Sequence, residues 1–309
     1  MERRGFFRMA AAGLAGVAQL GAAQTGTGSG SIGAGVGQDG AKPGGRNQNG
    51  TPIQVVIERA AQGQPSKGKV FALISPHLDD GPIFAGGTMA KLLQEGYKGY
   101  IIRTSNDDKD SVHTMSIGET VLANEQDVEY FVKNAGFERS FNLNYTNHMM
   151  DAVPPTELRS RLIFLFRLLK VDTVFSYDPW GHYEENPDHY VTAKAVESAC
   201  WMTGGGRDFT EHFAAGVMPH GVSEKYYFAR GPQLVNRAVD IGPTMAKKIE
   251  YIHSCRTMLT NMVGSDAKEA QDAFIQKNFV ARDKAVGQVY GLEAAEEFHY
   301  IGKGESFWR

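Results

Sequence analysis

Residues 70–80 read VFALISPHLDD, and both the fold class and the candidate site can be argued from this stretch. Its first five residues form a short apolar run, which is typical of a buried strand. The run stops at Pro76, and an imidazole (His77) and two carboxylates (Asp79 and Asp80) follow within four residues. Open α/β sheets bind their ligands at the carboxyl ends of strands. The stretch therefore indicates a metal site at the end of a first strand.

A second cluster of the same kind follows a later apolar run. Residues 186–189 read NPDH, and they come after the run at 171–177. Together the two clusters offer His77, Asp80 and His189, which could supply the three protein ligands of a catalytic zinc. Ferrous iron accepts the same donors in the same geometry.

The neighbouring carboxylates suggest roles in catalysis, but helix capping is a simpler interpretation that stays open. Asp79 is adjacent to a ligand but projects differently, so it is a candidate general base. Asp188 could orient an imidazole from behind. Alternatively, Asp79 or Asp80 caps the next helix, and Asn186 followed by Pro187 is itself a good helix start.

Strands and helices alternate along the first two thirds of the chain, which predicts an α/β fold with a parallel sheet covered on both faces. The expected strands are 70–75, 100–104, 141–145 and 171–177, and the expected helices are 86–96, 118–135, 154–169 and 187–201. Beyond Gly204 the pattern becomes mixed. There we expect strands at 225–230 and 235–241 and helices at 243–262 and 266–284.

Composition excludes several classes of protein. The net charge is −3, so no polybasic surface argues for nucleic acid. The two cysteines, Cys200 and Cys255, form no CxxC motif, so a thiolate zinc site and a dense disulfide scaffold are excluded. We interpret both as small buried apolar residues rather than as a disulfide.

The N-terminus has the pattern of a targeting segment. Arg3 and Arg4 precede a weakly apolar stretch and the small residues 21–23, which is typical of an export signal of the twin-arginine type. We expect a signal peptide at 1–23, a flexible glycine-rich linker at 24–51, and a folded domain at 52–309. The apolar stretch is too short and too weak for a membrane span. The protein is therefore expected to be exported to the periplasm or secreted, with transient contact to the twin-arginine machinery.

The motifs in this order resemble the PIG-L/LmbE family of zinc-dependent N-acetylglucosamine de-N-acetylases. The family pattern [PA]HxDD is similar to residues 76–80, its GG-T-[IM]-x-K-L helix start to 86–92, and its HPDH motif to 186–189. A C-terminal vDi…K…H-x-S pattern is similar to 239–241, Lys248 and 253–255. The resemblance implies a Rossmann-like three-layer α/β/α fold with a mostly parallel sheet and a mixed C-terminal extension. It also implies that His77, Asp80 and His189 hold zinc and that Asp79 is the base.

The chain departs from the family pattern near the expected substrate. Asn186 stands where the motif has its first histidine, and Gly81 stands where an acidic residue is usual. Asn124 and Asn147 stand near positions where the family has an arginine and an aspartate. His182, four residues before Asn186, could supply the missing acid. A surface histidine is the simpler interpretation.

We therefore expect an exported metal-dependent amide hydrolase that acts on an N-acetylated amino sugar or a glycan conjugate of one. One rival is a carbohydrate-binding protein that keeps the metal without catalysis, although binding alone needs no base such as Asp79. A second rival is a metal-dependent phosphoesterase, whose two-metal version would need more carboxylates. The exact substrate, the metal and the oligomeric state stay open at this point.

Overall fold

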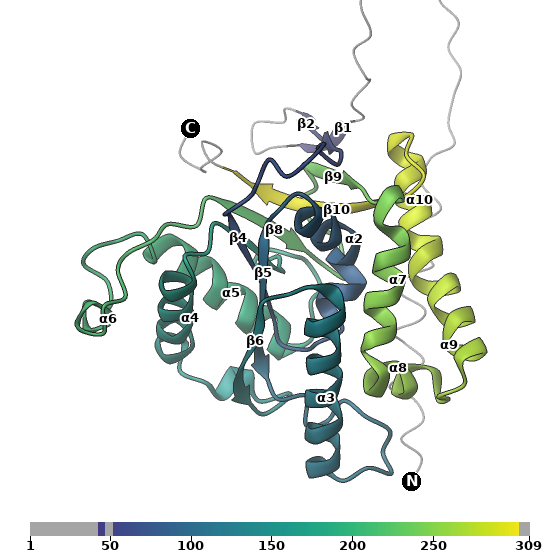
Figure 1. The fold of residues 1–309 in the computed structure, drawn as a ribbon, viewed down its shortest axis with the longest axis horizontal. Coiled ribbons are helices and arrows are strands. Elements are labelled where there is room, and N and C mark those ends of the chain that lie inside the picture. The colour runs from purple at the N-terminus through teal and green to yellow at the C-terminus, as the bar shows by residue number, and fades with distance from the viewer. Residues whose placement is uncertain (1–42, 47–51, 303–309) are drawn as a thin grey trace, which may run out of the picture. The chain divides into compact units, whose positions relative to one another are not determined.

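A sheet of eight strands carries the two predicted clusters, in the order β3-β9-β10-β8-β7-β4-β5-β6 (Figure 1). The computed structural model describes residues 43–46 and 52–302. The strands of the sheet are β3 Val56–Glu58, β4 Val70–Ser75, β5 Lys98–Ser105, β6 Arg139–Tyr145, β7 Thr173–Tyr177, β8 Glu224–Phe228, β9 Arg237–Asp240 and β10 Ala295–Ile301. Two further strands, β1 Pro43–Arg46 and β2 Pro52–Gln54, pair with each other antiparallel.

The sheet is parallel except at one strand. β4 pairs in parallel with both β5 and β7, and the pairs β5–β6, β7–β8 and β3–β9 are parallel as well. β10 runs antiparallel between β8 and β9. The predicted fold class is thus confirmed, and β10 makes the C-terminal extension mixed.

Helices cover both faces of the sheet. They are α2 Asp80–Gln94, α3 Ile117–Ala135, α4 Pro155–Leu169, α5 Pro187–Met202, α6 Glu211–Ala214, α7 Met245–Ser254, α8 Arg256–Val263, α9 Lys268–Ile275 and α10 Ala281–Tyr290. Short 3-10 helices lie at Met150–Ala152 and Gly242–Thr244, and a π-helical turn, Gln276–Val280, joins α9 to α10. In Figure 1, α4 and α5 lie on one side of β4 and β5, and α2, α3 and α7 lie on the other. In the described part of the chain, no helix has the length and apolar character to cross a membrane.

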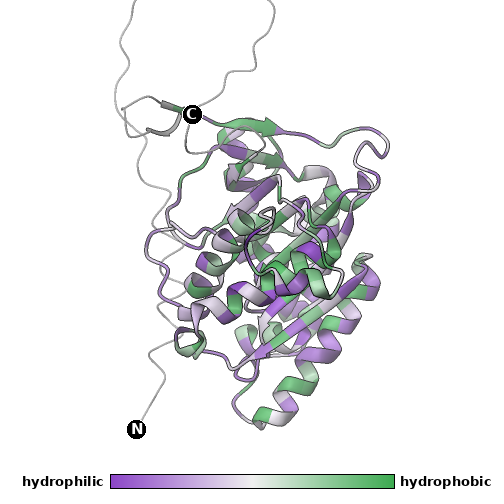
Figure 2. Ribbon diagram, turned by 90° about the vertical axis from the view of Figure 1, so that its left-hand side faces the viewer, coloured by the Kyte–Doolittle hydropathy of each residue, from purple (hydrophilic) through white to green (hydrophobic). Residues whose placement is uncertain are grey.

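The alternation of side chains along β4 builds both core layers. Phe71 and Leu73 pack in the layer of α2, α3 and α7, whereas Ala72 and Ile74 pack in the layer of α4 and α5. Every residue of β4 is buried because both faces are covered, which is why the strand reads as a continuous apolar run. Figure 2 shows the matching pattern in the helices, where apolar and polar bands alternate along the ribbon.

The Gly86-Gly87 pair lets α2 lie close to the C-terminal part of the chain. A Cβ at Gly87 would lie 2.6 Å from the Ile241 side chain, and a Cβ at Gly86 would lie 3.0 Å from Lys248 Cγ. These glycines therefore serve close packing of α2, the helix whose first residue is Asp80.

Several element boundaries differ from the sequence prediction. α2 begins at Asp80, six residues before the expected start at Gly86, because Pro82 is tolerated in a first helical turn. The expected helix 243–262 is broken at Cys255, where the Asp127 carboxylate accepts a hydrogen bond from Thr257 N at 2.6 Å and so supports a new helix start. β3 and β10 were not expected from the sequence.

The N-terminal predictions remain mostly untested. The expected signal peptide at 1–23 lies outside the described residues, as does most of the expected linker at 24–51. Within that linker, Pro43–Arg46 forms β1, whose backbone pairs with β2, so these four residues differ from the prediction of a flexible tether. Cys200 and Cys255 are both free and buried, as expected.

Candidate metal centre

The two predicted clusters meet at the carboxyl ends of two neighbouring parallel strands. β4 ends at Ser75, and the turn Pro76–Asp79 leads into α2. β7 ends at Tyr177, and a longer loop leads into α5 at Pro187. From β4 the chain proceeds to β5 and β6 on one side, and it returns to β7 on the other. Such a switch in strand order opens a crevice at the strand ends, where α/β sheets bind ligands.

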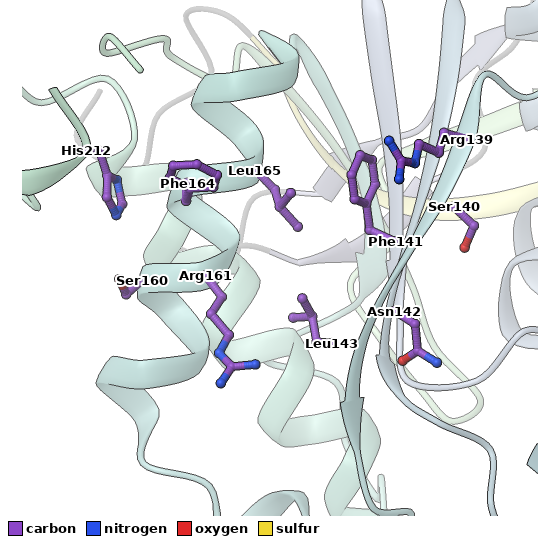
Figure 3. A pocket seen from close by; sticks show the side chains of 10 residues that line it. All are labelled: Arg139, Ser140, Phe141, Asn142, Leu143, Ser160, Arg161, Phe164, Leu165 and His212. Atoms are coloured by element: carbon purple, nitrogen blue, oxygen red, sulfur yellow. The ribbon is translucent and has the colours of Figure 1, made fainter. Parts of the chain in front are cut away.

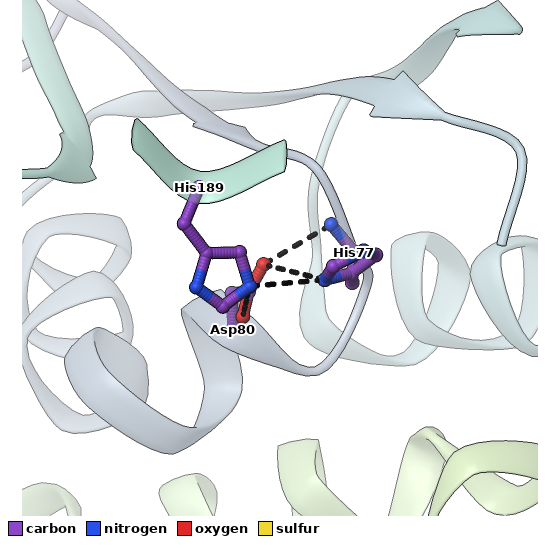
Figure 4. Close-up of side chains that lie close together, drawn as sticks. All are labelled: His77, Asp80 and His189. Carbon is purple, nitrogen blue, oxygen red and sulfur yellow. Dashed lines mark hydrogen bonds and ion pairs between the residues drawn. The ribbon is translucent and has the colours of Figure 1, made fainter. Parts of the chain in front are cut away.

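Three donor atoms converge in this crevice (Figure 4). His77 Nδ1 lies 3.2 Å from His189 Nε2 and 3.6 Å from Asp80 Oδ2. His189 Nε2 lies 3.7 Å from Asp80 Oδ1. All three side chains are buried, and one donor atom of each lies within 4.8 Å of the others. Two imidazoles and a carboxylate converging in this way fit Zn²⁺ or Fe²⁺.

A carboxylate supports His77 from behind. Asp188 Oδ2 lies 3.3 Å from His77 Nε2, the ring nitrogen that faces away from the cluster. Asp188 also accepts hydrogen bonds from His148 N at 2.7 Å and Met150 N at 3.3 Å. Burial alone would raise the pKa of Asp188, but these hydrogen bonds and His77 lower it, so the carboxylate stays ionised. The position matches the orienting role expected for Asp188.

Asp79 lies beside the donor atoms without being one of them. Its side chain is buried, and it makes no capping hydrogen bond although it occupies the N-cap of α2. Burial and the neighbouring Asp80 carboxylate raise the pKa of Asp79 well above its usual value. The capping interpretation is thus not supported, and the carboxyl stays available for proton transfer.

The Asn186 side chain contacts both the start of α5 and the donor cluster. Its Oδ1 accepts a hydrogen bond from Asp188 N at 2.9 Å, which makes it the N-cap of α5. Its Nδ2 lies 3.3 Å from His189 Nε2, so the amide also faces the donor cluster. The simple interpretation as a cap therefore holds without removing Asn186 from the site.

His182 is the one expected site residue that the structure does not bring to the cluster. Its side chain is exposed and its ring lies against Tyr183 at 6.3 Å between centroids, while its backbone N–H donates to Pro232 O. The exposure of the His182 side chain thus favours its interpretation as a surface loop histidine. The sequence-based choice of His182 relied on nearness along the chain, which does not fix the direction of a side chain in a loop.

Three residues near the cluster were missed from the sequence. The Tyr177 hydroxyl donates to Asp80 Oδ1 at 2.6 Å, and its ring stacks on His189 with centroids 4.1 Å apart. Glu184 Oε1 lies 3.1 Å from His189 Nδ1, and Arg230 forms an ion pair with Glu184. Burial would raise the pKa of Glu184, but His189 and Arg230 together lower it to about 2. Only Tyr177 carried a sequence signal, since it ends the strand before the second cluster.

A second acidic group lies on the other side of His77. Asp107, Asp110 and His77 could also gather around a cation. However, Asp107 Oδ2 is 2.5 Å from Arg103 Nη1, and Asp110 Oδ2 accepts from Asn147 Nδ2 at 2.5 Å. Asp107 is already neutralised by the Arg103 guanidinium, whereas Asp80 accepts from the neutral donors Tyr177 Oη and His77 N, so the His77, Asp80 and His189 group is the better cation site.

Two asparagines that depart from the family pattern, Asn124 and Asn147, form hydrogen bonds with the loop after β5. Asn124 Nδ2 donates to the backbone oxygens of Asp107 and Asp110, at 3.0 and 3.1 Å. Asn147 binds the same loop through Asp110. The glycine at position 81 is explained by close packing, since a Cβ there would lie 2.2 Å from Leu73 Cδ2.

A separate surface hollow of about 560 Å³ lies between β6 and α4 (Figure 3). It is lined by Arg139, Ser140, Phe141, Asn142, Leu143, Ser160, Arg161, Phe164, Leu165 and His212. None of the expected site residues is among them, so the hollow is distinct from the donor cluster.

Comparison with known proteins agrees with this geometry. The family model described as GlcNAc-PI de-N-acetylase, PIG-L, matches residues 72–200, which include every predicted site residue. Over these residues the chain is similar to the PIG-L family. The diacetylchitobiose deacetylase of Thermococcus kodakarensis is 26% identical over 189 residues, which cover 60% of this chain and 68% of that protein.

Solved structures share the fold of this chain. The N,N'-diacetylchitobiose deacetylase of Pyrococcus horikoshii, in complex with its inhibitor MPG, matches with a TM-score of 0.67 and 22% identity, covering 78% of this chain and 86% of that one. GalB of Pseudomonas putida KT2440, a 4-carboxy-2-hydroxymuconate hydratase, matches with a TM-score of 0.57 and 16% identity, covering 75% and 96%. One fold thus serves two reactions, so the reaction has to be argued from the site.

Proposed function

We propose that the protein is a metal-dependent amide hydrolase that removes the acetyl group from an N-acetylated amino sugar or a conjugate of one. The observation that carries the proposal is the buried convergence of His77, Asp80 and His189, next to which the chain carries the buried Asp79 carboxyl, which does not cap α2. The match of residues 72–200 to the PIG-L family model and the likeness to a curated diacetylchitobiose deacetylase support the choice of substrate class.

The residues of the site suit amide hydrolysis. A divalent cation held by His77, Asp80 and His189 would polarise the amide carbonyl and make a water molecule more acidic. The Asp79 carboxylate accepts the proton of the attacking water, whose oxygen adds to the carbonyl carbon. Asp79 then returns a proton to the nitrogen as the C–N bond breaks, leaving acetate and a free amine. Its raised pKa suits this second, acidic role.

Asn186 is suited to stabilise the charge that develops on the carbonyl oxygen. An amide cannot protonate a leaving group near neutral pH, but its NH₂ group donates hydrogen bonds. Because Asn186 Nδ2 lies 3.3 Å from His189 Nε2, it is held at the edge of the donor cluster. A hydrogen bond placed where charge develops lowers the barrier. We therefore assign Asn186 to the oxyanion and leave His182 outside the reaction.

Two observations weigh against the rival functions. A pure sugar-binding protein has no use for a buried carboxyl with a raised pKa beside the donors. A two-metal phosphoesterase would need the second acidic group, but Asp107 is paired with Arg103 and Asp110 with Asn147.

Acetate release tests the proposal directly. The protein, stripped of metal and reloaded with Zn²⁺ or Fe²⁺, is incubated with N-acetylglucosamine, N,N'-diacetylchitobiose and an aryl phosphate. We expect acetate from at least one N-acetyl sugar, dependence on added metal, and no phosphate release. Metal-loaded protein that releases no acetate, or that releases phosphate instead, would overturn the proposal.

We also propose that the protein is exported through the twin-arginine pathway. The support is the sequence of residues 1–23, in which Arg3 and Arg4 precede a short apolar stretch. Arg3→Lys combined with Arg4→Lys should hold the protein in the cytoplasm, because a receptor reads the arginine pair. Arg8→Lys, outside the pair, is the control and should be exported normally. Unchanged export of the double variant would refute the proposal.

A further inference from the structure

His189 is held by a carboxylate that the family motif does not include. Its Nε2 faces the donor cluster, and its Nδ1 lies on the opposite side of the ring, 3.1 Å from Glu184 Oε1. The Glu184 side chain is only 12% exposed, so this contact is shielded from water. His77 has the corresponding arrangement with Asp188. Each imidazole of the cluster thus has its own carboxylate behind it.

Arg230 fixes the orientation of the Glu184 carboxylate. The guanidinium contacts both carboxylate oxygens, with Nε 3.1 Å from Oε2 and Nη2 close to Oε1. Such a two-point contact holds a carboxylate in one plane, which a single bond does not. Arg230 comes from the segment after β8, whereas Glu184 belongs to the loop before α5. The pair therefore ties two strand ends together beside the cluster.

Other contacts restrict the same loop and the same ring. Glu184 Oε1 also accepts a hydrogen bond from Asn186 N at 3.0 Å, which shapes the turn that precedes α5. The ring of Tyr177 covers one face of His189 at a tilt of 14°. With a stacked face and a carboxylate oxygen 3.1 Å from Nδ1, His189 has little freedom to rotate away from the cluster.

We propose that Glu184, locked by Arg230, is a positioning residue that keeps the proton of His189 on Nδ1 and so leaves the lone pair of Nε2 free to bind the cation. An acceptor at one ring nitrogen selects the tautomer in which the other nitrogen is unprotonated. This inference rests on the metal-dependent function proposed above, and it adds two residues, 184 and 230, that the motif alone does not identify.

Zinc affinity tests the inference apart from activity. Removing such a supporting partner weakens metal binding by about tenfold to a hundredfold. We therefore expect Glu184→Gln to bind Zn²⁺ that much more weakly, in competition with a chelator of known affinity. The amide oxygen of Gln can still accept the hydrogen bond from Asn186 N, so the loop should keep its shape. Gln lacks the negative charge that pairs with Arg230 and favours a proton on His189 Nδ1. Arg230→Gln should weaken binding in the same direction but less. Glu185→Gln, an exposed neighbour of the same charge, is the matched control and should bind zinc normally.

A second measurement separates positioning from general loss of structure. Nitrogen NMR of histidine-labelled apoprotein reports which ring nitrogen of His189 carries the proton. We expect the Nδ1–H form in the wild type and a mixture in Glu184→Gln. Unchanged tautomer and unchanged zinc affinity in Glu184→Gln would overturn the inference while leaving the metal site intact. A wild-type protein that binds no zinc would instead remove the proposed function, and this inference with it.

Discussion

The two histidines of the cluster present different ring nitrogens. His77 uses Nδ1 and His189 uses Nε2, and the difference follows from the elements that carry them. His77 lies in a four-residue turn close to the cluster, so Nδ1, the ring nitrogen nearest its backbone, is the one that faces the other donor atoms. His189 projects from the first turn of α5, so it reaches with the far nitrogen. Each ring therefore turns its remaining nitrogen toward a carboxylate.

The first prediction concerns the donors themselves. His77→Ala, Asp80→Ala and His189→Ala should each lower metal occupancy, by more than the roughly tenfold to hundredfold loss seen when only a supporting residue is removed. Metal analysis after dialysis measures the effect. His220→Ala serves as control, because His220 pairs with Asp172 away from the cluster. Normal metal content in all three variants would show that the site is elsewhere.

The second prediction separates the base from the ligands. Asp79→Asn should keep the metal and the fold but lower kcat by about a hundredfold to ten-thousandfold, because an amide cannot accept the proton of water. Metal content and kcat are measured on the same sample. A variant without metal would mean that Asp79 is a ligand.

The sequence was sufficient for some of these residues and insufficient for others. The convergence of His77, Asp80 and His189 could be predicted because each follows the end of an apolar run, and parallel strands bring such ends together. Arg230 could not be predicted, since it lies 46 residues after Glu184 and their pairing depends on β7 and β8 being neighbours. Spacing along the chain did not decide the place of His182, because it does not fix the direction of a loop side chain, and the side chain is exposed.

Among the helices, α3 has the clearest local determinants. Ser116 Oγ accepts a hydrogen bond from Glu119 N, and Glu119 accepts one from Ser116 N at 2.8 Å, which completes a capping box. At the other end, Gly136 adopts a left-handed conformation at φ 82°. Ser116→Ala should lower the free energy of unfolding by about 1 kcal/mol. Urea unfolding measures it, and an unchanged midpoint would show that packing alone sets this helix start.

The same capping box gives a pH dependence. Hydrogen bonds from the Ser116 backbone and hydroxyl lower the pKa of Glu119 below its usual 4.5. The stabilisation is therefore present above pH 4.5 and is lost as pH falls through the lowered pKa. The difference in unfolding free energy between wild type and Glu119→Gln should shrink as urea unfolding is repeated at decreasing pH below 4.5. A difference in unfolding free energy that grows as the pH falls would contradict this prediction.

Elements were predictable where a local signal marks their ends. The helix stop at Gly136 and the apolar run of β4 are such signals. The break at Cys255 was not predictable, because its cause is Asp127, which lies 130 residues before Thr257 in the chain. β10 was missed as well, since its alternation includes the buried Glu296, a residue that normally marks an exposed position.

Across the whole molecule, one buried ionic triad joins α2, α7, α10 and β10. Lys248 Nζ lies 2.5 Å from Asp283 Oδ2 and 2.7 Å from Glu296 Oε1, and all three side chains are at most 2% exposed. Glu296 also accepts hydrogen bonds from Gly87 N and Thr88 N in α2. The C-terminal part of the chain thereby holds the helix that carries Asp80.

Removing the Lys248 ammonium should lower the free energy of unfolding. Lys248→Met leaves two buried carboxylates without their partner, and breaking a buried ion pair from one side costs about 3–5 kcal/mol. Urea unfolding should show this loss. The adjacent Lys247→Met is the matched control, because the exposed Lys247–Glu250 pair contributes at most about 1 kcal/mol. Equal effects of the two substitutions would mean that the triad does not hold the C-terminal part in place.

The interior place of β10 also bears on when the chain can fold during synthesis. β9 and β3 reach the rest of the sheet only through β10, although β3 is made early and β10 is the last strand of the described part. A nascent chain can pair β4 to β8 while it is still on the ribosome, but β3, β9 and β10 can join the sheet only once residues 295–301 have been made. Until then the β8 edge is open to pairing with other chains. This interval is where a chaperone would be needed, and a slow codon or a stalled ribosome just before residue 295 should increase aggregation.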